Sequence, residues 1–530
     1  MRRLLLVLAV SLGLALPQAA AAGSLFLVSG RGWGHGVGLS QYGAWGFAQN
    51  GMPYDQILAH YYPGTTLGPA PVAQVRVLVA ENRKVVRIGS AAPFKATDAS
   101  GAAYDVPAGA YELGADLTLV LPDKSVTLAP PVRFEPGDAP LELGRPYRGA
   151  LVLLSNGKRV SAVDYVGLEQ YLYGVVPGEM PADWTPAALE AQAVAARSYA
   201  LANLAVAGDF DLYSDTRSQV YRGIAVEDAR TTAAVDATSG QVVLFDGQVA
   251  ETFFFSTSGG RTAAAADVWG KPFPYLVSVD DPYDTLSPYH EWGPVLFTGK
   301  ELAQQLGALA PHAVRDLTVG QDSSGRAAAV TLVGDVTSTQ VSGVDLRRLL
   351  GLRSTWFDVG VLTLDAEKPL LVFGEKAVLR GVARGAGGVT LERKVLGGAW
   401  EPAGEPKVQE DGTFAVPLGK LRLSTAFRLT SPATPGLPAR IRVAARVVLD
   451  PPKGHKSLRG RVRPKAEGTA VEIQRLGQDG SWTPVAETAT DAAGEFKAKL
   501  LLEPGVYRAV ASPGGGLLPG TSAELDLSSA

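Results

Sequence analysis

One glutamate in this sequence is held in a way that suits acid–base chemistry. Glu179 lies in a Pro/Gly turn between Pro177 and Pro181, after a strand-like run from Tyr171 and before an Ala-rich segment that ends near Leu204. Proline fixes its own φ and restricts the residue before it, so this carboxyl is presented on a backbone with few available conformations. Glu179 is therefore either a catalytic acid or a charged loop residue.

A helix is predicted directly after that turn. Thr185 is a suitable N-cap, Pro186 suits the first helical position, and the helix runs to about Leu204. Gln192 and Arg197 stand out on its otherwise apolar surface. A buried guanidinium is costly unless it is paired, so Arg197 is either an exposed salt-bridge partner or a cation beside a carboxyl or a substrate oxygen.

Every second residue is glycine in the segment that runs from Gly30 to Gly38. Such a run cannot form an ordinary helix, and it can bring backbone amides close to a ligand or to another segment. If the run is extended, its other residues share one face: Arg31, Trp33, His35 and Val37. The glycines serve either tight packing or, together with the aromatic residues, a flat surface on which sugar rings stack.

A second polar cluster contains Ser256, Ser258 and Thr262. The sequence has no G-x-S-x-G elbow, and no histidine is near enough in the chain to propose a partner for a serine nucleophile. We therefore interpret these hydroxyls as part of a polar groove wall.

The composition excludes several kinds of site. There are 49 Lys and Arg against 52 Asp and Glu, a net charge of -3, so no basic balance points to nucleic acid. The chain has no cysteine, which excludes disulfides, thiolate zinc sites and a cysteine nucleophile. Its five histidines lack H-x-x-H or H-E-x-x-H spacing, so we expect neither a metal nor a cofactor.

The first 22 residues read as a cleaved export signal. Arg2 and Arg3 precede an apolar run, and Ala20 to Ala22 fit a small-residue cleavage site. The alternative is a membrane anchor, but the run is short for a span of about 20 residues. We expect an exported protein of the periplasm, cell envelope or extracellular space, with no membrane span after cleavage.

The remaining chain predicts an α+β protein that ends in two all-β units. Strand signals dominate residues 73–170, and helices and strands alternate up to residue 358. Beyond that, L-R-G, W-x-P and G-x-F motifs recur at offsets of 79, 82 and 82, which is typical of tandem β-sandwiches. The predicted units are a Gly-rich block at 23–70, a main body at 71–360, and repeats at 361–449 and 450–530.

Seven motifs together identify a family. They are Y-L-Y-G-V-V-P-G-E-M-P-A-D-W at 171–184, E-A-Q-A-V-A-A-R-S-Y-A-L at 190–201, S-Q-V-Y-R-G at 218–223, F-S-T-S-G-G-R-T at 255–262, W-G-K-P-F-P-Y-L at 269–276, V-S-G-V-D-L-R at 341–347 and G-R-G-W-G-H-G-V-G-L-S-Q-Y-G-A at 30–44. Over residues 25–358 the sequence resembles the SpoIID/LytB group of bacterial cell-wall proteins.

The resemblance implies a SpoIID-like fold and a peptidoglycan lytic transglycosylase. It implies Glu179 as the catalytic acid/base and Arg197 as an active-site residue. We expect further residues of the same motifs to line the substrate groove: Gln192, Trp33, His35, Gln41, Tyr42, Gln219, Tyr221, Ser256 and Ser258. The glycan strands are either intact or stripped of their stem peptides.

The sequence departs from the family pattern in two ways. The G-W-G-H-G-V-G block usually comes last but here comes first, as in a circular permutation, so residues 25–67 are predicted to pack against the groove formed by residues 171–280. Some relatives carry a zinc site with cysteines before the Q-V-Y motif. Tyr213 and Ser218 stand in those places here, so no zinc is expected.

The implied chemistry needs a single carboxyl. It protonates the glycosidic oxygen and then accepts the proton of the sugar's C6 hydroxyl, which closes a 1,6-anhydro ring. Such an acid requires a raised pKa, which an apolar surround can supply; the candidates are Val175, Val176, Met180 and Trp184.

Two other functions remain open. One is a non-catalytic wall-binding protein or activator of a cell-wall amidase. The other is a glycan hydrolase, which needs a second carboxylate such as Asp215, Glu251 or Asp267.

Overall fold

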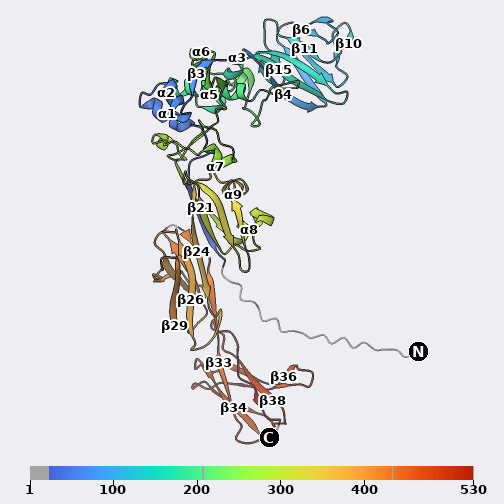
Figure 1. Ribbon diagram of the computed structural model, residues 1–530. Helices are drawn as coiled ribbons and strands as arrows, with labels where there is room; N and C mark the ends of the chain where they lie inside the picture. The colour runs from blue at the N-terminus through green and yellow to red at the C-terminus, as the bar shows by residue number, and fades with distance from the viewer. Residues whose placement is uncertain (1–22, 206–207, 433, 529–530) are drawn as a thin grey trace, which may run out of the picture.

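The computed structural model describes residues 23–205, 208–432 and 434–528, so the predicted export signal at 1–22 lies outside the described residues. The chain is elongated, with the helices around α5 and a large sheet at one end and the C-terminus at the other (Figure 1). Helices make up 17% and strands 43%, and nearly all strand pairs are antiparallel, which makes the protein a mixed α+β structure. Within the described residues, no helix has the length and apolar character needed to span a bilayer.

A seven-stranded sheet is the largest sheet of residues 74–167. Its order is β16 (Leu212–Tyr213), β4 (Gln74–Arg83), β15 (Val160–Gly167), β14 (Ala150–Ser155), β11 (Val132–Glu135), β6 (Phe94–Thr97) and β7 (Ala103–Val106). The strands predicted in this segment are confirmed. β15 ends at Gly167 and α3 (Leu168–Tyr173) begins at the next residue, so the sheet fixes the start of the chain that carries Glu179.

The run from Tyr171 is helical, so the predicted strand is wrong. It forms the end of α3 and then the one-turn helix α4 (Val176–Glu179). Tyr171, Leu172, Val175 and Val176 are all buried at the i, i+1, i+4, i+5 spacing of one helix face, so packing overrides the strand preference of these residue types.

The predicted helix after the turn is confirmed as α5 (Pro186–Ala202), with Pro186 at its first position. Thr185 occupies the N-cap position, but its hydroxyl caps no backbone N–H and instead accepts a hydrogen bond of 3.0 Å from the Gln49 side chain. Two helices of the N-terminal block, α1 (Gln41–Gln49) and α2 (Tyr54–Tyr61), pack on α5.

The first described strand, β1 (Leu25–Arg31), is inserted between two strands from much later in the chain. It pairs antiparallel with β20 (Glu291–Thr298) and with β24 (Phe357–Ala366), and the sheet continues through β26 (Lys376–Arg384) and β29 (Thr413–Lys420). The predicted boundary at residue 360 therefore falls inside β24, where the sheet is continuous.

Alternate residues of β1 serve two different hydrophobic cores. Phe26 and Val28 pack in the cluster beneath α8 (Gly299–Leu306) and α9 (Gly343–Leu350), whereas Leu25 and Leu27 pack in the cluster of the following β-rich segment. This follows from the two-residue period of a strand. One short segment thus ties the N-terminal block to the middle of the chain.

The chain ends in further sheets, in which β25 (Leu370–Val372) and β32 (Ala439–Ala444) pair parallel and the other neighbouring strands pair antiparallel. One has the order β25, β32, β30 (Thr425–Ser431), β27 (Thr390–Val395) and β28 (Glu401–Gly404). The last segment has a sheet of β33 (Arg446–Asp450), β34 (Ser457–Arg463) and β37 (Glu495–Lys499), packed against a sheet of β36 (Trp482–Ala489), β35 (Ala470–Leu476), β38 (Val506–Ser512) and β39 (Gly520–Thr521).

Phe26→Ala tests the role of β1. The ring is fully buried, so we expect its removal to lower the free energy of unfolding by about 3–5 kcal/mol. Hydrogen exchange should increase in β20 and β24. Val336→Ala is the control, because that side chain is 94% exposed. Equal stability of the two variants would contradict this account of β1.

Candidate active site

The carboxyl of Glu179 ends α4 and faces two glutamine side chains. Gln41, the first residue of α1, points its Nε2 at Glu179 Oε2 across 3.5 Å and donates to Gln192 Oε1 of α5 across 3.3 Å. Glu179 is half-buried. Burial raises the pKa of its carboxyl, and the hydrogen bond from Gln41 offsets part of that rise. The direction of the shift is the one that an acid catalyst needs.

The two glutamines are themselves buried. Gln41 is held at the start of α1 because Ser40 caps the helix, its Oγ accepting the Gly43 N–H at 3.2 Å. Gln192 is fully buried, and its Nε2 has no hydrogen-bond partner among the described residues. A buried donor without a partner is rare, so the cluster retains a polar group that a bound molecule or water can satisfy.

Three aromatic rings lie next to this cluster. Trp45 of α1 stacks on Trp184 with ring centroids 4.7 Å apart and planes 7° from parallel, and Tyr42 meets Trp184 edge-on at 4.8 Å. Tyr42 directly follows Gln41, and Met180 directly follows Glu179 and packs in the same hydrophobic cluster. Trp45 is not among the predicted site residues, although its i+3 spacing from Tyr42 would place the two rings on one face of a helix.

Arg197 does not join the Glu179 cluster. Its guanidinium is fully buried and forms a two-pronged ion pair with Glu169 of α3, with Nε 3.1 Å from Oε1. It also donates to the carbonyls of Gln241 at 3.0 Å and Val235 at 3.2 Å. This corrects the expectation that Arg197 acts on substrate: it is a buried, paired arginine that joins four segments.

Helix geometry explains the separation. Arg197 lies five residues after Gln192, which places the two side chains about 140° apart around α5. Gln192 therefore faces α1, whereas Arg197 faces α3 and α6 (Ala229–Ala237).

Gln219 and Tyr221 lie behind the site rather than in it. Both are buried, and Gln219 Oε1 accepts a 3.1 Å hydrogen bond from the hydroxyl of Tyr171. Burial, with a contribution from the charge of Glu179, raises the pKa of Tyr171. Tyr221 donates to the buried carboxylate of Asp164 at 2.8 Å, and burial raises the pKa of Asp164 to about 7. These residues form the support beneath Glu179.

The Gly-rich block is tightly packed and is not extended, so the predicted single face is wrong. Gly32, Gly34, Gly36 and Gly38 all have positive φ, between 75° and 122°. A Cβ at Gly38 would lie 2.1 Å from the carbonyl oxygen of Phe253. Tight packing against residues 253–258 is therefore what the glycines provide.

Trp33 and His35 consequently point to different places. Trp33 is 40% exposed and meets Tyr289 edge-on at 4.4 Å, with Arg353 over its ring. His35 accepts the Val37 N–H at Nδ1, so its Nε2–H donates to the Phe254 carbonyl at 3.1 Å. Burial lowers the pKa of His35 to about 4, which keeps the ring neutral and structural.

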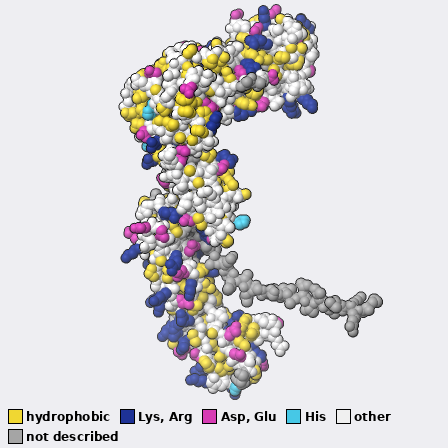
Figure 2. Space-filling model, viewed as in Figure 1, with side chains coloured by type: hydrophobic (Ala, Val, Ile, Leu, Met, Phe, Trp, Pro, Cys, Tyr) yellow, Lys and Arg dark blue, Asp and Glu magenta, His cyan; other side chains and the backbone are white. Residues whose placement is uncertain are grey.

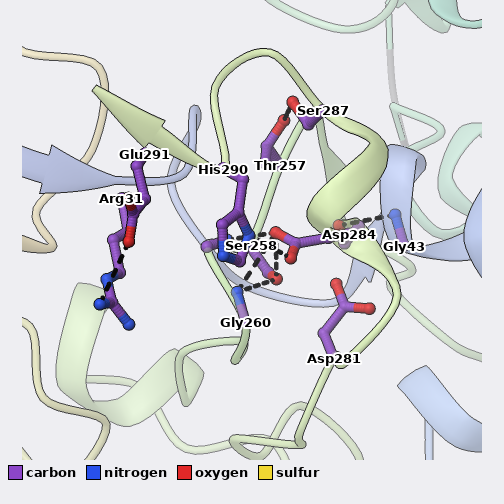
Figure 3. A network of polar contacts seen from close by, with 12 residues as sticks. Arg31, Gly43, Thr257, Ser258, Gly260, Asp281, Asp284, Ser287, His290 and Glu291 are labelled. Atoms are coloured by element: carbon purple, nitrogen blue, oxygen red, sulfur yellow. Dashed lines mark hydrogen bonds and ion pairs between the residues drawn. The ribbon is translucent and has the colours of Figure 1, made fainter.

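Ser258 belongs to a buried network around Asp284 (Figure 3). Its hydroxyl donates to Asp284 Oδ2 at 2.9 Å, while His290 Nδ1 donates to Asp284 Oδ1 at 2.7 Å. Serine and histidine thus bind the same carboxylate, and the serine hydroxyl is directed at Asp284. Ser256 is half-buried, and its backbone carbonyl accepts the Tyr42 N–H at 3.0 Å.

This network also supports α1. Asp281 lies beside Asp284 and accepts a 2.8 Å hydrogen bond from the hydroxyl of Tyr61. Burial, together with the charge of Asp284, raises the pKa of Asp281 to about 6. A Cβ at Gly43 would lie 2.2 Å from Asp281, so only glycine allows α1 to approach this closely. The network thereby fixes the helix that carries Gln41.

Two of the three candidate second carboxylates, those of Asp215 and Asp267, are engaged elsewhere. Asp215 forms an exposed ion pair with Arg217, which lowers the pKa of Asp215 to about 2. Asp267 accepts a hydrogen bond from Ser323 at 3.0 Å. Glu251 is half-buried, and its backbone N–H donates to the hydroxyl of Tyr275. Among the described residues, none of the three has a hydrogen bond or ion pair with Glu179.

The residues at the positions of the implied zinc site do not fit a zinc ion. The Tyr213 N–H donates to Ser218 Oγ at 3.1 Å, and the Arg217 guanidinium lies 3.8 Å from the centre of the Tyr213 ring. A cation already lies against this ring, and neither side chain supplies a thiolate.

Arg197→Met tests the structural role of that arginine. It leaves the Glu169 carboxylate without its ion pair, so we expect stability to fall by about 3 kcal/mol. Arg197→Met/Glu169→Leu should recover part of the loss. Arg217→Met is the control, because its ion pairs are exposed and should contribute less than about 1 kcal/mol. Full stability of Arg197→Met in chemical denaturation would refute the structural role.

Comparison with known proteins agrees with the motifs. The family model SpoIID, described as "Stage II sporulation protein", matches residues 156–245. Stage II sporulation protein D of Bacillus subtilis (strain 168) is 35% identical over 214 residues, which cover 37% of this chain and 61% of that protein. The protein of the same name from Bacillus amyloliquefaciens is 34% identical over 220 residues, covering 37% and 61%.

The Bacillus subtilis (strain 168) protein named "Amidase enhancer" is 37% identical over 113 residues, which cover 21% of this chain and 15% of that protein. Among solved structures, the human OSCAR ligand-binding domain matches with a TM-score of 0.13 and 14% identity over 31% of this chain and 97% of that one, too low to bear on the fold. The chain thus spans about three fifths of the length of the two sporulation proteins, and its residues 156–245 match the SpoIID family.

Proposed function

We propose that the protein is a peptidoglycan lytic transglycosylase that uses Glu179 as its acid and base. The observation that carries this proposal is the environment of Glu179: a half-buried carboxyl with a raised pKa, whose side-chain partner in the described structure is the neutral amide of Gln41. A carboxyl in this setting retains its proton at a higher pH than an exposed glutamate, as a general acid must.

The reaction balances with this one carboxyl. The Glu179 proton passes to the glycosidic oxygen as the bond from that oxygen to C1 breaks. The C6 hydroxyl of the same sugar then bonds to C1, and its proton passes to Glu179. The cycle restores the acid, consumes no water and leaves a 1,6-anhydro end. It is therefore consistent with a site where, in the described part of the chain, Asp215, Glu251 and Asp267 form no hydrogen bond or ion pair with Glu179.

The aromatic cluster supports a sugar substrate. Tyr42 and Trp45 are half-buried and pack with Trp184 in the hydrophobic cluster that includes Met180, the residue after Glu179. Aromatic faces are suited to stacking on sugar rings. The names of the relatives, a sporulation protein and an amidase enhancer, support a role at the cell wall. The proposal places the protein in the cell envelope or outside the cell, with no cofactor.

A second candidate function is that of a non-catalytic amidase activator. It is favoured by the similarity to the protein named "Amidase enhancer". Under this alternative Glu179 is a binding residue, and the protein stimulates a separate amidase without cleaving glycan itself.

Glu179→Gln separates the two functions. The amide preserves the side-chain shape but cannot carry the proton, so we expect anhydro-sugar ends to fall by at least about 100-fold. The measurement is mass spectrometry of products from purified glycan, both intact and stripped of stem peptides.

The matched control is Glu190→Gln, at a half-buried glutamate of α5. Equal anhydro product from Glu179→Gln and wild type would remove Glu179 from the mechanism. New reducing ends in place of anhydro ends would indicate a hydrolase. Stimulation of a cell-wall amidase that survives Glu179→Gln, without any cleavage, would support the activator.

Gln41→Leu tests how the acid is tuned. The Gln41 hydrogen bond lowers the pKa of Glu179, so its loss should raise that pKa further. Because activity requires the protonated acid, the alkaline limb of the kcat/KM profile should move to higher pH, by about one unit. Gln49→Leu on the same helix is the control and should leave the limb in place. A shift to lower pH in Gln41→Leu would contradict the assignment.

A further inference from the structure

A groove rich in basic residues lies at the far end of the molecule from Glu179. It has a volume of about 1100 Å³ and is bounded by β33, β34, β37 and the loop of residues 451–456. Five Lys and Arg side chains line it: Lys453, Lys456, Arg459, Arg461 and Lys497. Figure 2 shows Lys and Arg side chains gathered on this lower part of the molecule, although the whole chain has a net charge of -3.

The strand register places like charges against each other in this groove. Arg459 of β34 lies directly opposite Lys497 of β37, and both are exposed. At the other end of the sheet, Arg446 of β33 lies opposite Arg463 of β34. Like charges at directly opposite positions destabilise an antiparallel pair. The guanidinium of Arg446 donates to the carbonyl of Phe373, and that of Arg463 donates to the carbonyls of Val462 and Ala493. The repulsion left in the groove is therefore that between Arg459 and Lys497.

The equivalent sheet of the preceding repeat has no like-charged pair at the position that corresponds to Arg459 and Lys497. L-R-G at 379–381 corresponds to L-R-G at 458–460, so Arg380 is the counterpart of Arg459. Arg380 lies opposite Ala415 and forms an ion pair with Glu367. Among the described residues, Arg459 and Lys497 form no ion pair. The same framework thus has a neutralised arginine in one copy and two unpaired cations in the other.

Acidic side chains in the groove only partly balance the cations. They are Asp450, Asp491 and Glu495. Asp450 lies opposite Arg459, and Glu495 lies opposite Arg461. Asp491 Oδ1 accepts the backbone N–H groups of Ala493 and Glu495, both at 2.9 Å, so this carboxylate is already engaged by its own turn. The groove keeps an excess of positive charge that faces solvent.

We propose that this groove binds a linear anionic polymer of the cell surface whose charge is carried by phosphodiester groups. Alternate residues of a strand lie about 7 Å apart on one face, so Arg459 and Arg461 of β34 form a row of cations beside Lys497 of β37. Such a row matches a chain with regularly repeated charges better than a single compact anion. The site is independent of Glu179 and of its chemistry, and it would hold the protein on the wall.

The test measures binding of the protein comprising residues 23–530 to synthetic poly(glycerol phosphate). The test variant is Arg459→Gln/Arg461→Gln/Lys497→Gln. The control is Lys407→Gln/Lys420→Gln/Arg422→Gln, which removes the same charge from exposed positions of the preceding repeat. We expect the control to bind like wild type and the test variant at least 10-fold more weakly, with wild-type affinity falling as salt rises from 50 to 200 mM.

Three other ligands are measured in the same way, to distinguish the polymer from other anions and from neutral glycan. Inorganic phosphate, neutral dextran and phosphatidylglycerol vesicles should bind more weakly than the polymer. Equal loss in the test and control variants would overturn the site, and stronger binding to vesicles than to the polymer would identify a membrane surface instead. Arg459→Lys keeps the charge and should retain binding. The melting temperature of the test variant should not fall, because the like-charge contact between Arg459 and Lys497 is removed.

Discussion

Glu179 is kept away from cations, and the candidate site depends on this constraint. In the described structure its side-chain partner is the amide of Gln41, whereas the nearby arginine of α5, Arg197, is bound to Glu169 on another face of the helix. A guanidinium beside Glu179 would lower the pKa of its carboxyl and hold it ionised. The position of Arg197 on α5 directs its guanidinium to Glu169, and the Glu179 carboxyl keeps a neutral partner.

The N-terminal block, residues 23–70, positions Gln41 against Glu179. β1 anchors it between β20 and β24, and the Gly-rich run packs it against residues 253–258. Tyr42 is tied to Ser256, and Asp281 lies close beneath Gly43, so α1 is fixed at its first turn. Gln41 reaches Glu179 because of these contacts. Gln41, which lowers the pKa of Glu179, thus lies 138 residues before it in the sequence.

Local signals predicted much of this structure, and long-range partners could not be predicted. The start of α5 at Pro186 and the strands of residues 73–170 are specified by neighbouring residues. The run at Tyr171 was misread because packing overrides its strand preference. Arg197 and its partner Glu169 lie 28 residues apart, and nothing in the intervening sequence indicates their contact.

The central claim is that burial keeps Glu179 protonated above the ordinary range of a glutamate. Carbon-13 NMR titration of the labelled side-chain carboxyls measures this directly, with the signal assigned from its absence in Glu179→Gln. The account predicts a titration midpoint above 4.5, the ordinary value for this side chain. A midpoint at or below 4.5 would mean that the Glu179 carboxyl loses its proton at the same pH as an ordinary glutamate, or at a lower one. That result would contradict the proposed role of Glu179 as an acid.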